Sequence, residues 1–250
     1  MILDQLNKIQ KRYDKTGYIV LKNYFHAKYL KKIALEISNY KELKCDKYLD
    51  RSGKIRRLEK FYNKTNSLIL LNKKVEKLLE IIFKEKYIIF KDKFNIKPPE
   101  GEGFNAHYDG IFHFYNQKKK HPGWYKYAKT FVTVLIPLDK SYNKNGTIQI
   151  AKEDKYSFFR LLKNTKQNGT PNLTSKYEKK LKFRSINLEV GDFCIFSNRC
   201  AHRSGKNKTK KNRRILYFTY NKKSEGNFYR KYFSDKNKSK SKFKSLSGQI

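Results

Sequence analysis

The chain has 250 residues, of which 38% are hydrophobic and 15% aromatic, so it holds enough apolar material for a core despite 32% charged residues and a formal net charge of +37. Its longest useful apolar run, residues 131–138, has the length of a strand and falls well short of a membrane-spanning helix. Residues 1–18 carry charges throughout, which argues against a secretion signal and gives the cytoplasm as the expected compartment.

The first 86 residues are predicted to be mixed and mostly helical. Residues 17–21 form a short apolar run suited to a strand, and residues 27–40 place apolar side chains at helical spacing. A second helix is predicted over residues 74–84, with its aliphatic side chains facing inward. We expect these elements to be scaffold without chemistry of their own.

From residue 87 onward, apolar residues recur at every second position, which is typical of strands. Turn signals such as Asn145-Gly146 and Gly191-Asp192 separate the apolar runs. This pattern predicts a mainly β fold with flanking helices, a cupin-like double-stranded β-helix or jelly roll. The predicted strands are residues 87–96, 104–108, 130–138, 147–150, 185–188, 193–197 and 213–220.

The domain organisation is predicted to be simple. One domain covers residues 1–236, with the helical section to about residue 86 and the jelly-roll core over about 87–221. Within it, residues 161–182 are polar and are expected to be an insertion with some helix. Residues 237–250 are rich in lysine and serine and are predicted to be a disordered basic tail.

The first candidate metal ligands are His107 and Asp109, at the end of a predicted strand. Side chains alternate along a strand, so these two point to the same side of the sheet while Tyr108 points away. A histidine and a carboxylate in this arrangement supply two thirds of the 2-His-1-carboxylate triad that binds iron(II) with open coordination positions.

The third candidate ligand is His202, and eleven residues beyond it lies Arg213 on the next predicted strand. An iron-bound 2-oxoglutarate needs a fixed cation for its far carboxylate. Arginine suits that task because its planar fork pairs with a carboxylate through two hydrogen bonds and stays charged. The pattern therefore predicts an iron(II) centre that binds 2-oxoglutarate.

The three cysteines, Cys45, Cys194 and Cys200, form no CxxC pair and are expected to be reduced. Cys200 lies close enough to His202 for a zinc site to be considered. That site would fill the fourth coordination position and leave Arg213 without a purpose, so the open triad is preferred. Cys194 is expected to be a core residue.

These residues resemble the phytanoyl-CoA dioxygenase family, iron(II)- and 2-oxoglutarate-dependent oxygenases with a double-stranded β-helix core. The resemblance runs from Gly17 to about residue 236, and its most specific parts are His107-Tyr108-Asp109, residues 145–148 and residues 191–213. The chain departs from the family at residues 151–154, which read Ala-Lys-Glu-Asp where a Pro-Gly-Ser-His stretch is common. Residues 123–125 and 224–236 look similar to bacterial members acting on small polar substrates such as aminoethylphosphonate.

The resemblance implies a mechanism and a set of roles. His107, Asp109 and His202 would bind iron, and Arg213 with Ser204 would hold the far carboxylate of 2-oxoglutarate. With dioxygen as the oxidant, oxidative decarboxylation of 2-oxoglutarate would yield succinate and carbon dioxide, with one oxygen atom going to succinate and the other to a C–H bond of a small anionic or zwitterionic substrate. Because Asp109 is present, hydroxylation is preferred to halogenation.

The predicted strand before His107 carries further candidate residues. Lys93, Asn95 and Lys97 alternate on one face, so Lys93 or Asn95 is a candidate contact for the cosubstrate or substrate, with solvated lysines on an edge strand as the alternative. Arg214 must point away from its neighbour Arg213 and is expected to be a surface or structural partner.

The aromatic loop over residues 112–127 has two interpretations. It is either a lid whose aromatic rings grip an ammonium group or ordinary packing at the mouth of the jelly roll. His113 and His121 within it are expected to be solvated or to contact substrate rather than metal.

The high positive charge also has two interpretations. Lysine is spread over the whole chain rather than clustered, which favours a compositional origin over a nucleic-acid surface, and a positive surface would also attract small anions. The alternative function is a basic nucleic-acid-binding protein built on a catalytically inactive jelly roll.

Overall fold

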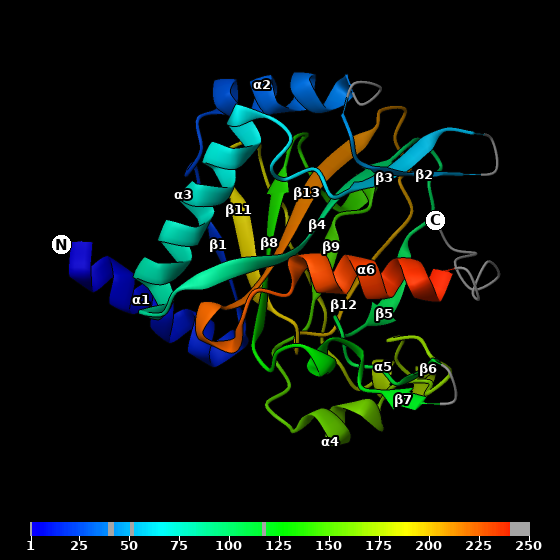
Figure 1. Cartoon of the computed structure of the whole chain (residues 1–250). Helices are drawn as coiled ribbons and strands as arrows, with labels where there is room; N and C mark the ends of the chain where they lie inside the picture. The colour runs from blue at the N-terminus through cyan, green and yellow to red at the C-terminus, as the bar shows by residue number, and fades with distance from the viewer. Residues whose placement is uncertain (1, 40–42, 51–52, 117–118, 241–250) are drawn as a thin grey trace.

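Two antiparallel sheets face each other at the centre of the protein (Figure 1). The structure, a computed structural model, describes residues 2–39, 43–50, 53–116 and 119–240. In spatial order the larger sheet consists of β1 (Tyr18–Leu21), β11 (Phe193–Ser197), β8 (Phe131–Pro137), β13 (Arg213–Lys222), β4 (Tyr87–Lys97), β3 (Ile55–Glu59) and β2 (Asp46–Leu49). The smaller sheet consists of β10 (Arg184–Ser185), β9 (Ile148–Ile150), β12 (His202–Ser204) and β5 (Phe104–His107).

Helices cover the outer face of the larger sheet (Figure 1). The long helices are α1 (Ile2–Thr16), α2 (Ala27–Ser38), α3 (Asn66–Phe83) and α6 (Tyr229–Lys240), and the short ones are α4 (Phe158–Leu162), α5 (Ser175–Glu178), η1 (Gly123–Lys126), η2 (Asn143–Asn145) and η3 (Lys223–Glu225). A hairpin of β6 (Phe114–Asn116) and β7 (Lys119–His121) completes the set. No helix in the described part of the chain combines the length and apolarity needed to cross a membrane.

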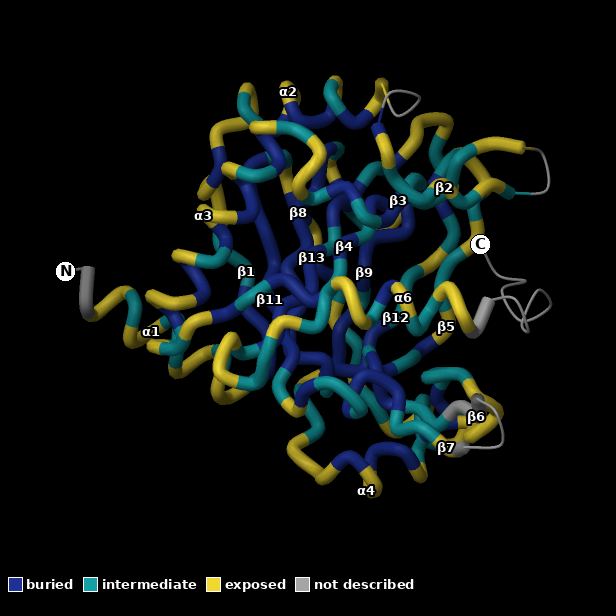
Figure 2. Tube along the Cα trace, in the orientation of Figure 1, coloured by how far each residue is buried: buried dark blue, intermediate teal, exposed yellow. Residues whose placement is uncertain are grey.

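Side-chain alternation along β13 separates the core from the site. Leu216, Phe218 and Tyr220 pack on the outer face in one hydrophobic cluster with α2 and α3. Ile215 and Tyr217 point between the sheets, into a different cluster. Every residue of β8 is buried, because helices cover one face of this strand and the smaller sheet covers the other (Figure 2). The mainly β jelly-roll prediction is confirmed.

The helical section differs in detail from the prediction. Helix α3 begins at Asn66 rather than at residue 74, because Thr65 caps it by accepting a hydrogen bond from the amide of Leu68 at 3.2 Å. Helix α1 and the hairpin of β2 and β3 were not predicted. The hairpin is highly charged, and only its packing in the larger sheet shows which face is buried, whereas α1 carries Leu6, Ile9 and Tyr13 at helical spacing, a pattern that could have indicated it.

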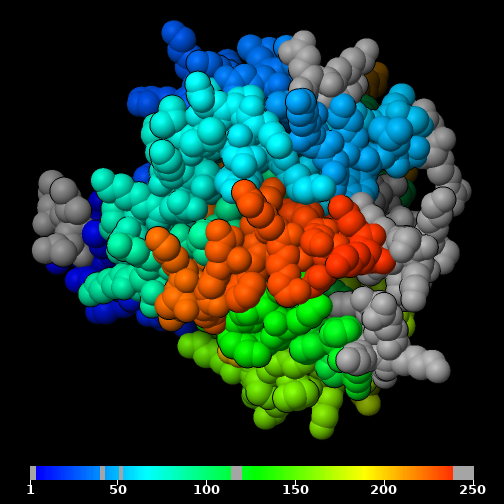
Figure 3. Space-filling model, viewed as in Figure 1, coloured from blue at the N-terminus to red at the C-terminus, as the bar shows by residue number. Residues whose placement is uncertain are grey.

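Helix α6 extends further than expected and lies across the front of the molecule, between α3 and the loop around η1 (Figure 3). It continues to Lys240, so the first four residues of the predicted disordered tail are helical; the other ten lie outside the described residues. Asp235 ties it to the loop by accepting hydrogen bonds from Lys126 and Tyr127, both at 2.9 Å.

Asp92, on the outer face of β4, joins three segments of the chain. Its fully buried carboxylate accepts hydrogen bonds from the amides of Lys60, Phe61 and Tyr62 at 2.6–3.0 Å, and from the hydroxyl of Tyr229 on α6 at 2.9 Å. This one side chain therefore holds the turn after β3 and the start of α6 against the sheet that carries the site.

Replacing Asp92 with asparagine is expected to lower the free energy of unfolding by roughly 1–3 kcal/mol, because an amide group would face buried N–H donors that need an acceptor. Urea unfolding followed by fluorescence measures the change. Asp14→Asn on exposed α1 is the matched control and should have almost no effect. Equal stability of the two variants would contradict the role given to Asp92.

Candidate active site

Three potential metal ligands meet at the inner face of the smaller sheet. The antiparallel pairing of β12 with β5 places His202 directly opposite His107, and their ring centroids are 4.2 Å apart. Asp109 follows β5 by two residues. One ligand atom from each of the three lies within 4.8 Å of the other two, which is the spacing needed to hold one ion. The structure thus brings together all three predicted ligands.

Hydrogen bonds fix the orientation of both imidazoles. Nδ1 of His107 lies 2.7 Å from the carbonyl of Asn105, and Nδ1 of His202 lies 3.0 Å from the carbonyl of Cys200. A carbonyl can only accept, so each Nδ1 carries the proton and each Nε2 keeps a lone pair. This is the tautomer in which Nε2 serves as a metal ligand.

Asp109 is held by two further contacts. Its Oδ2 accepts a hydrogen bond from Oγ1 of Thr133 at 3.3 Å, and its backbone carbonyl accepts one from the side-chain amide of Asn198 at 3.1 Å. Thr133 in turn lies 3.1 Å from the hydroxyl of Thr219 on the neighbouring strand. The carboxylate is therefore positioned by the larger sheet, across the space from the two imidazoles.

The electrostatics of the triad suit a divalent cation. Burial and the charge of His202 lower the pKa of His107 to about 3, and burial also lowers the pKa of His202. Burial opposes ionisation of Asp109, but the imidazoles and the nearby lysines outweigh it and lower its pKa. At neutral pH the site consists of two neutral imidazoles and one carboxylate, the forms that bind metal.

A second cluster of polar groups lies where β13 pairs with β4. Arg213, only 1% exposed, stands opposite Lys97, and its Nη1 donates to the carbonyl of Gly146 at 2.9 Å. Lys97 donates to Oγ of Ser204 at 3.0 Å and to the carbonyl of Gly205 at 2.5 Å. Burial and the charge of Arg213 lower the pKa of Lys97 to about 7.

The Asn145-Gly146 turn makes this cluster possible. Gly146 has a φ of +72°, in the left-handed region, and a Cβ there would collide with the carbonyl of Gly205. Close approach of the two backbones places both carbonyls within reach of the Lys97 ammonium. The predicted turn thus shapes the site as well as connecting two strands.

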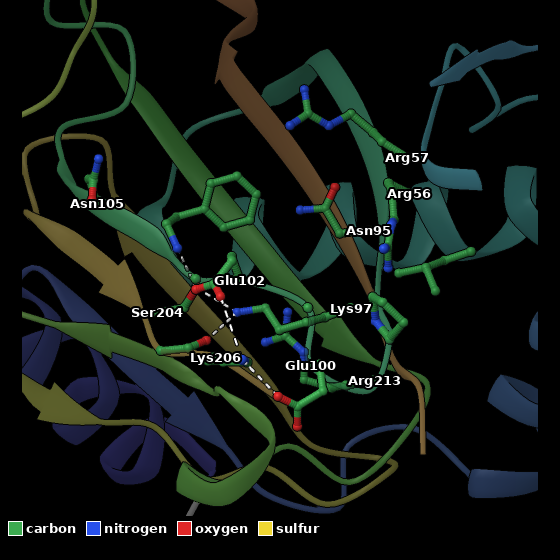
Figure 4. A pocket seen from close by; sticks show the side chains of 16 residues that line it. Arg56, Arg57, Asn95, Lys97, Glu100, Glu102, Asn105, Ser204, Lys206 and Arg213 are labelled. Carbon is green, nitrogen blue, oxygen red and sulfur yellow. Dashed lines mark hydrogen bonds and ion pairs between the residues drawn. The ribbon is translucent and has the colours of Figure 1, made fainter. Parts of the chain in front are cut away.

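A cavity of about 570 Å³ opens between β3, β4 and β5 and reaches Arg213 (Figure 4). Four buried polar atoms of its lining residues have no hydrogen-bond partner within the described part of the chain: Nε of Arg213, Nε of Arg57, Nε of Arg56 and Oδ1 of Asn95. Unpaired buried polar groups cost free energy, so their convergence on one cavity indicates a bound polar molecule. Lys97 and Ser204 also line the cavity, whereas the three triad residues are not among its lining.

The predicted strand residues all face the space between the sheets. Lys93, Asn95 and Lys97 pair with Tyr217, Ile215 and Arg213 of β13. The ammonium of Lys93 lies 4.9 Å from the ring centre of Tyr217. Its positive charge contributes to the lowered pKa values of both His107 and Asp109.

Two cavity residues were missed as functional candidates. The alternation with Lys93 could have indicated Lys97, but no signal in the sequence points to Arg57.

Other predicted residues fall outside the site. Arg214 forms a two-pronged ion pair with Asp139, at 2.9 and 2.8 Å, as expected for a structural partner. Cys194 is in the core. Cys200 donates to the carbonyl of Gly17 at 3.3 Å and is not part of the candidate metal cluster. His113 packs against Phe158 with ring centroids 5.6 Å apart.

Residues 151–154, the segment that departs from the family pattern, contact the side of the chain at Tyr108 that faces away from the candidate metal ligands. Asp154 accepts hydrogen bonds from Tyr108, at 3.2 Å, and from Tyr177. Tyr108 lies between the candidate ligands His107 and Asp109 and points to the opposite side. Asp154 therefore holds the end of β5, which carries the candidate ligand His107, in place through the outward-facing Tyr108.

The family model described as phytanoyl-CoA dioxygenase (PhyH) matches residues 13–215. The chain belongs to the phytanoyl-CoA dioxygenase family. As a member with a His-Asp-His cluster, it is a 2-oxoglutarate-dependent dioxygenase that uses iron. The resemblance inferred from the sequence motifs is confirmed.

Two sequence relatives of this phytanoyl-CoA dioxygenase family member are named for phosphonate substrates. A 2-aminoethylphosphonate dioxygenase from uncultured bacterium HF130_AEPn_1 is 26% identical over 88% of this chain and 83% of its own length. A methylphosphonate hydroxylase from Gimesia maris is 30% identical, but the match spans 62% of this chain and about half (53%) of that relative.

Solved structures share the fold of this family member. The α-ketoglutarate-dependent epimerase SnoN from nogalamycin biosynthesis has a TM-score of 0.68 at 16% identity, covering 88% of this chain and 84% of SnoN. EctD from S. alaskensis, solved with 2-oxoglutarate and 5-hydroxyectoine, has a TM-score of 0.67 at 15% identity, covering 87% of this chain and 76% of EctD.

Asp109→Ala is expected to abolish stoichiometric binding of iron(II), because it removes the only carboxylate of the cluster. The measurement is the rise in melting temperature when iron(II) is added without oxygen, since a ligand that binds only the folded state stabilises it. Asp14→Ala on α1 is the control and should keep the full rise. An unchanged rise in Asp109→Ala would remove Asp109 from the metal site.

Proposed function

We propose that this dioxygenase hydroxylates a C–H bond of a small anionic molecule and converts 2-oxoglutarate and dioxygen to succinate and carbon dioxide. One observation carries the proposal. A cluster of two neutral imidazoles and a carboxylate lies in the same inter-sheet space as a buried arginine whose Nε lacks a partner.

The chain's residues divide into two groups in this proposal. His107, Asp109 and His202 hold iron(II) and leave coordination positions open. Arg213, Lys97 and Ser204 bind the far carboxylate of 2-oxoglutarate, and Arg213 Nε gains the acceptor that it lacks. Bound iron supplies the activation of dioxygen, while the protein fixes the ligands and the cosubstrate and limits access of water.

The anionic nature of the substrate is supported by charge and by the relatives. Lys93, Lys97, Arg57 and Arg213 all face the space between the sheets or line the cavity. Two of the relatives are named for phosphonates, which are small anions.

Anaerobic addition of iron(II) and 2-oxoglutarate tests the proposal. Chelation of iron by 2-oxoglutarate is expected to produce a visible charge-transfer band, and admission of oxygen with a substrate should then yield succinate. A protein that binds iron(II) and 2-oxoglutarate separately but shows no band would contradict the proposed arrangement.

Arg213→Ala should weaken binding of 2-oxoglutarate by about 1.5–3 kcal/mol, the usual scale for a hydrogen bond to a charged group. Titration of the charge-transfer band measures the dissociation constant. Arg214→Ala removes the neighbouring arginine and is the matched control, with no expected change because that side chain pairs with Asp139. Weakened binding of 2-oxoglutarate in Arg214→Ala, with unchanged binding in Arg213→Ala, would assign the cosubstrate to Arg214.

The affinity for 2-oxoglutarate should fall as the pH rises above about 7. The pKa of Lys97 is lowered to about 7 in the free protein, and only its protonated form attracts a carboxylate. Each pH unit above that value therefore costs up to about tenfold in affinity, until the pKa of the complex is reached.

Titrations from pH 6 to about 9 would show this dependence, and Lys97→Met should largely remove it. Lys77→Met, at an exposed position on α3, should retain it. An equally steep dependence in Lys97→Met would place the titrating group elsewhere.

A further inference from the structure

At the β3 end of the cavity, a buried acceptor and a buried donor lie on adjacent strands without hydrogen-bond partners among the described residues. The acceptor is Oδ1 of Asn95, a residue that is only 7% exposed, and the donor is Nε of Arg57. Both residues line the cavity, and the pairing of β3 with β4 sets them directly opposite each other (Figure 4). The wall of the cavity therefore presents an acceptor beside a donor.

The charge of Arg57 is compensated within the protein. Its Nη1 lies 3.7 Å from Oε1 of Glu59, and the other oxygen of that carboxylate contacts Tyr48 and Lys236 of α6. Oε1 of Glu59 is a further buried acceptor without a hydrogen-bond partner in the described part of the chain, but Glu59 is not among the residues that line the cavity. Arg57 thus offers the cavity a hydrogen-bond donor rather than a free charge, and Asn95 carries the acceptor.

The two lysines that flank Asn95 on the same face of β4 are committed elsewhere. Lys97 donates to Oγ of Ser204 at 3.0 Å, and the ammonium of Lys93 lies 4.9 Å from the ring centre of Tyr217. Oδ1 of Asn95 is therefore an acceptor that the folded chain leaves unpaired. Such an atom costs free energy unless a ligand supplies the missing donor.

The cosubstrate does not supply that donor. Both carboxylates of 2-oxoglutarate are ionised at neutral pH, so these groups and its keto oxygen only accept hydrogen bonds. In the proposed function its far carboxylate binds Arg213 on β13. Two strand spacings, about 10 Å, separate β13 from β3. The cosubstrate therefore satisfies Arg213 and leaves Asn95 unpaired.

The cavity has room for a second molecule. Its volume of about 570 Å³ is that of a small-molecule pocket, and the far carboxylate of 2-oxoglutarate fills only one end. The substrate is the second molecule that this dioxygenase must bind. Glu100 and Glu102 also line the cavity, so a positively charged donor would meet carboxylates there as well as cations.

We propose that Asn95 accepts a hydrogen bond from an amino or hydroxyl group of the substrate, while Nε of Arg57 donates to an oxygen of the same molecule. The substrate is then a small organic anion that carries a hydrogen-bond donor, rather than an anion with only alkyl substituents. This inference rests on the proposed function and narrows its substrate class.

The test compares three phosphonates of nearly equal size on the protein loaded with iron(II) and 2-oxoglutarate without oxygen. 2-Aminoethylphosphonate, 2-hydroxyethylphosphonate and propylphosphonate share the anionic group and end in an amino, a hydroxyl or a methyl group. At least one of the two donor-bearing probes should perturb the charge-transfer band at concentrations roughly tenfold or more below those of propylphosphonate, because the methyl group leaves Asn95 unpaired. The tighter of the two identifies the donor.

A matching set with a carboxylate as the anionic group consists of 3-aminopropanoate, 3-hydroxypropanoate and butanoate. The inference is overturned if the methyl-terminated member of the set that binds is held as tightly as both donor-bearing members. It is also overturned if none of the six compounds perturbs the band. Absence of the band before any probe is added would refute the proposed function instead, so the two failures are distinguishable.

Asn95→Leu removes the acceptor at nearly constant size. The variant should lose the preference for the donor-bearing probe and keep the dissociation constant of 2-oxoglutarate, whose proposed contacts lie elsewhere. Asn63→Leu, at an exposed position, is the matched control and should keep the preference. The band formed with 2-oxoglutarate shows that each variant is folded. A full preference in Asn95→Leu would remove Asn95 from the substrate site.

Asn95→Asp replaces the amide with a carboxylate, which binds an ammonium more strongly than a hydroxyl group. The ratio of the dissociation constants of 2-hydroxyethylphosphonate and 2-aminoethylphosphonate should therefore rise by roughly tenfold in this variant. An unchanged ratio would show that neither probe places its donor at residue 95 and would contradict the inference.

Discussion

The register between β5 and β12 is the constraint on which the site depends. It places His202 opposite His107 in the smaller sheet, with β9 pairing on the other side of β12. Because side chains alternate, a slip by one residue would turn either imidazole to the opposite face and separate the candidate metal ligands. The same short strand ends at Ser204, which meets Lys97 from the larger sheet. The strand β12, of three residues, thus links the candidate metal ligands to the cluster of Lys97, Ser204 and Arg213.

The second organising feature is an excess of positive charge inside the fold. Lysines on the inner face of β4 are costly to bury, and the lowered pKa values of Lys93 and Lys97, each to about 7, express that cost. Such positions persist where an anion offsets the penalty. In the proposed function the dianionic cosubstrate does so at Arg213 and Lys97. The positive charges on which the proposed function depends are therefore those between the sheets.

Much of this arrangement could be predicted from the sequence, and the limits have physical causes. Alternation of apolar and polar residues predicts β4 and β13, whereas β8 and β11, buried on both faces, are predicted as short continuous apolar runs, and all four strands were placed to within two residues. The choice of His107, Asp109, His202 and Arg213 as candidate site residues follows from their spacing in the sequence. The roles of Arg57, Glu59 and Lys236 could not be predicted, because they depend on a charged hairpin and a charged helix whose buried faces are set by tertiary packing.

Iron-edge anomalous diffraction from crystals grown anaerobically with iron(II) and 2-oxoglutarate tests the central claim most directly. The account predicts one iron bound by Nε2 of His107, a carboxylate oxygen of Asp109 and Nε2 of His202, with the far carboxylate of 2-oxoglutarate on Arg213. Iron at another position, or a 2-oxoglutarate whose far carboxylate points away from Arg213, would contradict it.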